Sequence, residues 1–210
     1  MKKLVFLLVA MFMAGSTPMM AQQENNVEQT SKQAEKEAKK AEKEAKKAAK
    51  KAEKEAKKAK EEAIKNAQFE AALQAIENRK FVLKADDVDL KRGGTNFVNN
   101  STNFVMLNGD EASIQINSSK AFAGPNGMGG ITVEGKASDI EMSTDKKGNV
   151  YFEMNVHGTG VSARVSFRMN KGTNRCSATV SPNFNSSRIT LNGELTPLGG
   201  TTNVFKGRAL

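Results

Sequence analysis

The segment from Ala34 to Ala67 consists almost entirely of alanine, lysine and glutamate, and it constrains the fold more than any other part of the chain. All three residue types favour the α-helix, and neither glycine nor proline occurs between Ser31 and Asn78. Ser31 is a suitable N-cap, and several glutamates precede a lysine by four residues, which stabilises a helix. The sequence predicts a helix from about Ser31 to Asn78, about 70 Å long at ~1.5 Å per residue.

Alanine recurs along this tract at intervals of four and three residues, as apolar residues do along the seam of a coiled coil. Alanine buries little apolar surface, so such a seam stabilises a dimer far less than leucine or isoleucine would. Over residues 31–64 we therefore favour a monomeric rigid spacer over a coiled-coil dimer, and both interpretations stay open. In composition the tract resembles the alanine-lysine-glutamate helix of the envelope protein TolA.

Residues 32–65 contain fourteen lysines and eight glutamates, which contribute +6 to the formal net charge of +9. A basic surface of this kind attracts nucleic acids and anionic envelope polymers. The tract has no arginine and no aromatic residue, however, and its acids are interleaved with its lysines. We expect a solvated spacer and no nucleic-acid partner, while binding to anionic envelope polymers stays open.

Residues 1–21 have the organisation of a secretory signal peptide. Two lysines precede a ten-residue apolar run, which is shorter than the ~20 residues that cross a bilayer. Cleavage is expected between Ala21 and Gln22, with cleavage after Ser16 as the alternative. We expect an exported protein, periplasmic or outer-membrane-associated, that has no transmembrane segment after cleavage and begins with a disordered linker at residues 22–30.

Residues 65–78, at the end of the predicted helix, differ from the charged tract. Phe69, Ala72, Leu73 and Ile76 follow the spacing of one helix face and form an apolar stripe. Side chains of this size are not expected on a solvated spacer. We therefore predict that the helix end docks on the domain that follows, which would span residues 65–210.

From Phe81 onward, apolar and polar residues alternate, as in antiparallel strands with one buried face. Turn signals such as Asn108-Gly109 separate the strands, and the alternation changes phase near Ser138-Asp139, which indicates a bulge. The pattern predicts a mainly β fold with a long N-terminal helix and a meander of about eight antiparallel strands. The meander would close as a barrel or a sandwich, helped by strand glycines such as Gly135 and Gly193.

The chain has few residues suited to catalysis. Its single cysteine, Cys176, alternates with apolar residues and is expected to be a small buried side chain. Its single histidine, His157, lies on the polar face of a strand without a second histidine or cysteine nearby. Asp86, Asp87 and Asp89 are clustered at a strand irregularity, where solvated charge explains them. The sequence therefore predicts no catalytic, cofactor or metal site, although two buried acids about 5–10 Å apart would favour a carboxylate-based hydrolase.

The candidate ligand site is a glycine-rich loop with exposed backbone amides between two predicted strands. Its candidate residues are Gly124, Asn126, Gly127, Gly129 and Gly130. The loop matches neither a P-loop nor a dinucleotide-binding fingerprint, and a plain connection is the alternative interpretation.

Several short motifs follow one another along the second part of the chain: Asn103-Phe104-Val105, Asn126-Gly127-Met128-Gly129-Gly130, Lys147-Gly148-Asn149, Ile189-Thr190-Leu191-Asn192-Gly193 and Val204-Phe205-Lys206-Gly207-Arg208. Their order resembles that of a family known as domain of unknown function 4251, over about residues 65–210. This family is found in secreted proteins of Gram-negative gut bacteria of the Bacteroidota type and their relatives. The resemblance implies the β architecture and export, but no activity.

These features predict an exported cell-envelope protein with a non-catalytic β binding module on a rigid helical spacer. Its partner would be an envelope component or a small ligand. The alternatives are a self-associating coiled-coil envelope scaffold and a carboxylate-based hydrolase.

Overall fold

The computed structural model of the chain describes residues 23–90, 94–117, 130–159, 161–183, 188–199 and 203–207. The predicted signal peptide and its cleavage site at Ala21 and Gln22 lie outside these residues. Of the candidate ligand loop, Gly124, Asn126, Gly127 and Gly129 also lie outside them. The chain divides into two compact units, Met1–Ala56 and Lys57–Leu210.

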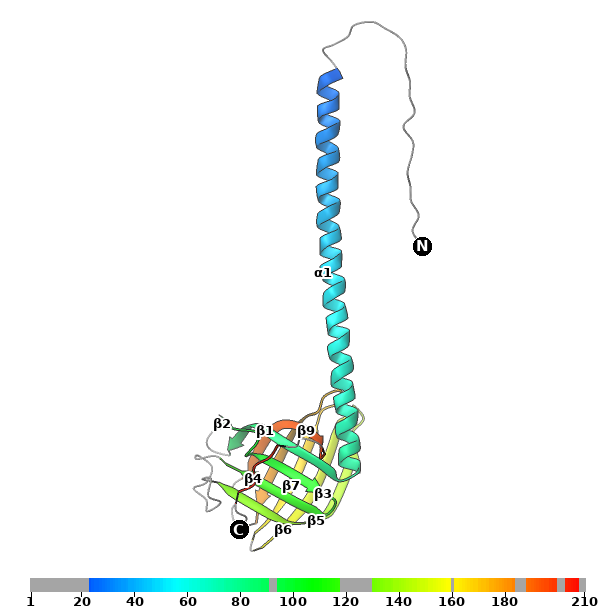
Figure 1. The fold of residues 1–210 in the computed structure, drawn as a ribbon. Helices are drawn as coiled ribbons and strands as arrows, with labels where there is room; N and C mark the ends of the chain where they lie inside the picture. The colour runs from blue at the N-terminus through cyan, green and yellow to red at the C-terminus, as the bar shows by residue number, and fades with distance from the viewer. Residues whose placement is uncertain are drawn as a thin grey trace. The chain divides into compact units, whose positions relative to one another are not determined.

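Helix α1 runs from Gln23 to Glu77 (Figure 1). It begins earlier than the predicted start near Ser31, and residues 23–30 belong to the helix, where the sequence predicts a disordered linker. No helix-breaking residue occurs there, and acids in this stretch suit the positive end of the helix dipole. Within the first unit, the side chains from Glu42 to Ala56 are exposed, and an ion pair of 2.6 Å joins Lys46 to Glu42 one turn earlier.

Within the second unit, the end of α1 contributes to the hydrophobic core. Phe69, Ala72 and Ile76 are buried as predicted, whereas Ile64 is 59% exposed. Leu73 is only partly buried, and Ala75 joins the buried face instead. At about 100° per residue, the buried face is centred between Ala72 and Ile76, which leaves Leu73 at its edge.

Nine antiparallel strands follow within the described residues. They are β1 (Lys80–Leu90), β2 (Gly94–Phe97), β3 (Phe104–Asn108), β4 (Glu111–Ile116), β5 (Ile131–Thr144), β6 (Val150–Gly158), β7 (Ser162–Met169), β8 (Arg175–Pro182) and β9 (Ile189–Pro197). Sequential neighbours pair from β3 to β9, and β1 pairs with β3 on one edge and with β9 on the other.

The pairing of β1 with β9 closes eight strands into a barrel (Figure 1). The predicted antiparallel meander is thus confirmed, and its closure is a barrel rather than a sandwich. The extra strand, β2, pairs with the second half of β1. The sequence did not predict β2, because its four residues, Gly-Thr-Asn-Phe, show no apolar alternation.

Two bulges and two glycines bend the wall of the barrel. The register of β5 against β6 shifts between Ser138 and Glu141, which confirms the predicted bulge, and Asp139 has a left-handed φ of 48°. A Cβ atom at Gly135 would lie 2.1 Å from the carbonyl oxygen of His157. At Gly193 of β9, a Cβ atom would lie 1.8 Å from the carbonyl oxygen of Lys84, next to a second register shift in β1. Glycine at these positions allows neighbouring strands to approach closely.

The interior of the barrel is packed with apolar side chains from alternate positions of the strands. At its centre, the rings of Phe81, Phe152 and Phe167 meet edge to face with centroids 5.4–5.5 Å apart. Cys176 belongs to this core as predicted, and burial raises the pKa of its thiol to about 12.

The end of α1 lies at the end of the barrel where β1 begins. Its buried residues belong to the same core cluster as the barrel interior. The carbonyl of Arg79 accepts a hydrogen bond of 2.7 Å from the N–H of Gly109, in the turn between β3 and β4. The carbonyl of Lys80 accepts one of 3.0 Å from Leu198, just after β9. The predicted docking of the helix end is therefore confirmed.

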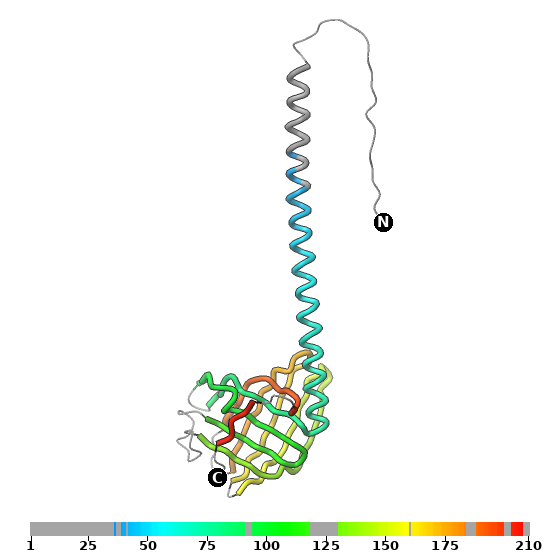
Figure 2. The backbone as a smooth tube through the Cα atoms, viewed as in Figure 1, coloured from blue at the N-terminus to red at the C-terminus, as the bar shows by residue number. Residues whose placement is uncertain are grey.

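The C-terminal segment, residues 203–207, lies on the outer wall over β4 (Figure 2). Gln115 holds it there, although this side chain points away from the interior. Its Nε2 donates to the carbonyls of Thr102 at 3.0 Å and Phe205 at 2.6 Å, and its Oε1 accepts from the N–H of Gly207 at 2.6 Å. Gln115 is fully buried as a result.

Neighbouring outward side chains on this wall are buried as well. Val82, Phe104 and Thr132 each have 0% exposure, and Val82 and Phe104 are not part of the interior cluster. At the edge of this region, Lys206 of the C-terminal segment forms an ion pair of 3.0 Å with Glu134. We call this region, over the start of β1, over β3 and β4 and over the start of β5, the covered half of the outer wall.

Candidate functional site

The other half of the outer wall carries a continuous row of polar side chains. Asp87, Asn192, Ser177, Arg168 and Tyr151 stand opposite one another across β1, β9, β8, β7 and β6. Each alternates with residues of the barrel interior and therefore points outward. We call this region the open half of the outer wall.

A shallow depression of about 470 Å³ lies over this row. We call it the polar depression, and it is lined by Asp87, Arg168, Asn170, Arg175, Cys176, Ser177, Asn192 and Gly193. Apart from Cys176 and Gly193, all of these residues have polar or charged side chains. Because the side chains stand on paired strands, the backbone fixes their spacing.

Asn192 organises the side of the depression nearest to β1. Its Nδ2 donates hydrogen bonds to Oδ1 of Asp87 at 2.7 Å and to Oδ2 of Asp89 at 2.9 Å. Its Oδ1 accepts a hydrogen bond of 2.7 Å from Ser177. One amide thus uses both of its hydrogens to hold two carboxylates side by side.

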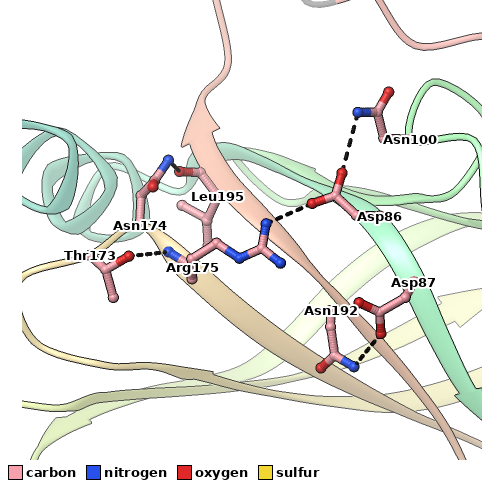
Figure 3. A network of polar contacts seen from close by, with 8 residues as sticks. All are labelled: Asp86, Asp87, Asn100, Thr173, Asn174, Arg175, Asn192 and Leu195. Atoms are coloured by element: carbon pink, nitrogen blue, oxygen red, sulfur yellow. Dashed lines mark hydrogen bonds and ion pairs between the residues drawn. The ribbon is translucent and has the colours of Figure 1, made fainter. Parts of the chain in front are cut away.

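The bulge in β1 turns a third carboxylate toward the same wall. The register shifts between Ala85 and Asp87, so that Asp86 and its neighbour Asp87 both find partners on the outside. Asp86 forms an ion pair of 2.7 Å with Arg175 and accepts a hydrogen bond of 3.4 Å from Asn100 (Figure 3). The charge of Arg175 is therefore balanced within the protein.

Arg168 differs from Arg175 in this respect. Its guanidinium carbon lies 5.9 Å from the centroid of the Tyr151 ring, within the range of a cation–π interaction. No carboxylate of the described residues forms an ion pair with Arg168, and its side chain is exposed. The depression therefore has one charged donor that is available to a ligand.

The aspartates are not arranged as the hydrolase hypothesis requires. Asp86, Asp87 and Asp89 are each partly exposed, and each already contacts Arg175 or Asn192. The hypothesis needed two buried acids facing each other across a cleft. The structure gives these three aspartates no such arrangement.

His157 lies on the outer wall, between two serines. Its Nε2 is 3.0 Å from the hydroxyl of Ser138, and its Nδ1 is 3.4 Å from that of Ser162. Asp139 accepts from Asn155 and Ser138 instead of the imidazole, and these hydrogen bonds lower the pKa of its carboxyl. In a serine–histidine–aspartate relay the acid must orient the histidine, so these residues do not form one.

A second depression, of about 510 Å³, lies between the end of α1 and the end of β9. Its lining residues are Ala71, Gln74, Ala75, Asn78, Lys80, Pro197 and Leu198. Lys80 is the only charged side chain among them, and the alanines offer no hydrogen-bonding groups. This groove therefore has fewer charged and hydrogen-bonding side chains for a ligand than the polar depression.

In the described part of the chain, no three His, Cys, Asp or Glu side chains are grouped closely enough to hold a metal ion. None of the described helices contains an apolar stretch long enough to cross a membrane.

Of the candidate ligand loop, the structure describes only Gly130. It is buried, and a Cβ atom there would lie 2.0 Å from the carbonyl oxygen of Ile116 at the end of β4. Sequence reasoning did not identify Asn192, Arg168 or Ser177 as site residues. Their polar alternation was visible, but their proximity to Asp87 depends on the closure of β9 on β1, which the sequence left open.

The sequence profile of a family described as "Domain of unknown function (DUF4251)" matches residues 63–195, more than half of the chain. The chain belongs to the DUF4251 family. The resemblance inferred from the sequence motifs is thereby confirmed. The DUF4251 match includes the docked end of α1 and every residue of the polar depression, whereas the C-terminal segment at 203–207 follows it.

A solved structure of the DUF4251 family supports the same fold. It is the crystal structure of a DUF4251 family protein from Bacteroides eggerthii DSM 20697, with 39% sequence identity and a TM-score of 0.58. The similarity covers 65% of this chain and 91% of that one. Among curated proteins, no match was found.

Proposed function

We propose that this DUF4251 protein is a non-catalytic binding module of the cell envelope. The observation that carries the proposal is the polar depression, where side chains from four strands converge on an open surface. The barrel interior is filled with apolar side chains, so the outer wall offers the hydrogen-bonding groups that a polar ligand needs.

Binding fits the depression better than catalysis does. Asn192 and Arg175 already bind the carboxylates, and these acids do not form the pair of buried carboxyl groups that a carboxylate-based hydrolase needs. Polar groups fixed on paired strands are also preorganised, which lowers the entropic cost of binding a ligand. Both features favour recognition of a ligand over its conversion.

The remaining parts of the proposal concern location and presentation. The leader at residues 1–21 exports the chain to the periplasm or the outer membrane, and the charged part of α1 serves as a monomeric spacer. The composition of residues 42–56 supports the spacer, because alanine, lysine and glutamate side chains offer little apolar surface that could hold a dimer together. The partner is an envelope component or a small ligand.

Retention of the full chain by its own cell-envelope fraction tests this function. We expect the envelope fraction to retain the parent chain. The double variant Arg168→Gln/Asn192→Ala should pass through unretained, as a reference protein that does not bind the envelope does. The matched control is Arg164→Gln, which removes an exposed arginine of the same strand that is already paired with Glu153. Equal retention of the parent and the double variant would show that the polar depression is not the binding site.

A further inference from the structure

The polar depression has opposite chemistry at its two ends. Arg168 stands on β7 and Asp87 on β1, with Ser177 and Asn192 in register between them. Three strand intervals of ~4.8 Å separate the two ends, or about 14 Å along the row. A ligand that contacts the whole row must therefore be extended.

The Arg168 end suits a carboxylate. The guanidinium presents two parallel N–H donors that match the two oxygens of a carboxylate, and the Tyr151 ring supports its position. The neighbouring Arg175 is already neutralised by Asp86. One available positive charge matches a singly charged carboxylate better than a doubly charged phosphate.

The Asp87 end suits neutral hydroxyl groups. Oδ1 of Asp87 accepts from Asn192, and within the described residues no other hydrogen bond reaches this carboxylate. Its second oxygen is thus an acceptor for a ligand hydroxyl, whereas a second anionic group would be repelled. Between the ends, the Ser177 hydroxyl and the Asn192 amide provide further short polar contacts.

We propose that the polar depression binds an acidic oligosaccharide, with the carboxylate of a uronic-acid residue on Arg168 and the hydroxyls of a neighbouring neutral sugar along Ser177, Asn192 and Asp87. This inference rests on the proposed function, because it assigns a ligand class to the same depression. An acidic oligosaccharide combines the length, the single charge at one end and the dense hydroxyl groups that the row requires.

The test is an NMR titration of the full chain with cellobiouronate, a disaccharide of glucuronic acid and glucose. Neutral cellobiose is the matched probe without the carboxylate, and inorganic phosphate is the matched anion without the sugar. We expect cellobiouronate to shift the amide resonances of Ser177, Asn192 and Gly193 saturably and to bind about tenfold or more tighter than cellobiose, since the two differ by a charge-assisted bidentate contact.

Two variants localise the interaction. Arg168→Gln is expected to reduce cellobiouronate affinity to that of cellobiose, while Arg164→Gln keeps the preference of the parent. Equal binding of the two sugars, absence of binding by both, or saturable binding of phosphate at the same resonances would overturn the assignment of the ligand class.

The two proposals fail in distinguishable ways. If the depression variant loses envelope retention but the parent does not bind cellobiouronate, the depression is a binding site for another class of ligand. If cellobiouronate binds at Arg168 but envelope retention does not depend on this residue, the ligand class is correct and the proposed envelope-binding role is wrong.

Discussion

The covered and open halves of the outer wall are built from neighbouring strands of one barrel, yet their outward side chains differ in exposure. In the covered half, Val82, Phe104 and Gln115 are completely buried. In the open half, Asp87, Ser177 and Asn192 stay partly exposed. In both halves, outward residues alternate with residues of the interior in the usual way, so strand geometry alone does not set their exposure.

The difference lies in what the outward side chains bind. Gln115 forms hydrogen bonds with backbone groups of distant segments, which hold the C-terminal segment in place. The side chain of Asn192, by contrast, forms its hydrogen bonds within the described residues with side chains of its own wall, namely Asp87, Asp89 and Ser177. The amide of Gln115 thus holds the C-terminal segment against the wall, because it binds that segment's backbone. The amide of Asn192 binds neighbouring side chains instead, and the wall around it stays accessible to solvent.

The largest effect is expected for Phe104→Ala in the covered half. Because this ring is fully buried, its removal should lower the free energy of unfolding by about 3–5 kcal/mol. Urea denaturation of the full chain measures the change. Phe97, which is 89% exposed, is the control, and Phe97→Ala should unfold like the parent. Similar stability of the two variants would contradict the burial of Phe104.

A smaller loss is expected for Gln115→Ala. This change leaves the carbonyl of Phe205 and the N–H of Gly207 without their partner, at a cost of about 1–3 kcal/mol. Hydrogen exchange of the Gly207 amide, compared with the parent, reports release of the C-terminal segment. Unchanged protection of this amide would show that Gln115 is not what holds the segment.

Asn192→Ala should cost less stability than Gln115→Ala, about 1 kcal/mol or less, because water can solvate Asp87, Asp89 and Ser177 at this partly exposed site. Urea denaturation of both variants under the same conditions checks the order. If Asn192→Ala were the more damaging change, the contrast between the two halves would be wrong.

The smallest effect concerns pH and Glu153, in the open half. Hydrogen bonds from Arg164 and Ser166 lower the pKa of Glu153. A lowered folded-state pKa contributes stability above the unfolded pKa of about 4.3 and loses that contribution as pH falls through the folded value. Glu153→Gln should therefore lose slightly less stability than the parent between about pH 6 and about pH 3. Denaturation curves at both pH values measure this difference, and an equal or larger loss in the variant would contradict it.

Local signals in the sequence predicted much of the fold. Asn108-Gly109 forms the expected hairpin turn, the bulge near Ser138-Asp139 is present, and Phe69 docks with the end of α1. Each of these depends on residues that are close in sequence. The burial of Gln115 depends on Phe205, which lies 90 residues away, and no local pattern reveals such a contact.

The candidate site was less predictable for the same reason. The aspartates of β1 were noticed as a cluster, but their partners Arg175 and Asn192 come from strands near the end of the domain. The edge of the buried helix face was also misjudged at Leu73, because the choice between Leu73 and Ala75 depends on where the barrel contacts the helix. In both places tertiary contacts decide between options that local spacing leaves nearly equal.

The pairing of β1 with β9 has a consequence for how the domain folds. These strands are the first and last of the barrel in sequence, so their contact closes the longest loop in the domain and carries a high entropic cost. During synthesis, β9 emerges last, and until then β1 has one edge unpaired. The hydrogen bonds that create the polar depression between Asp87 and Asn192 can form only in this last step. The polar depression therefore exists only after the barrel has closed, because Asn192 and Gly193, which line it, belong to β9.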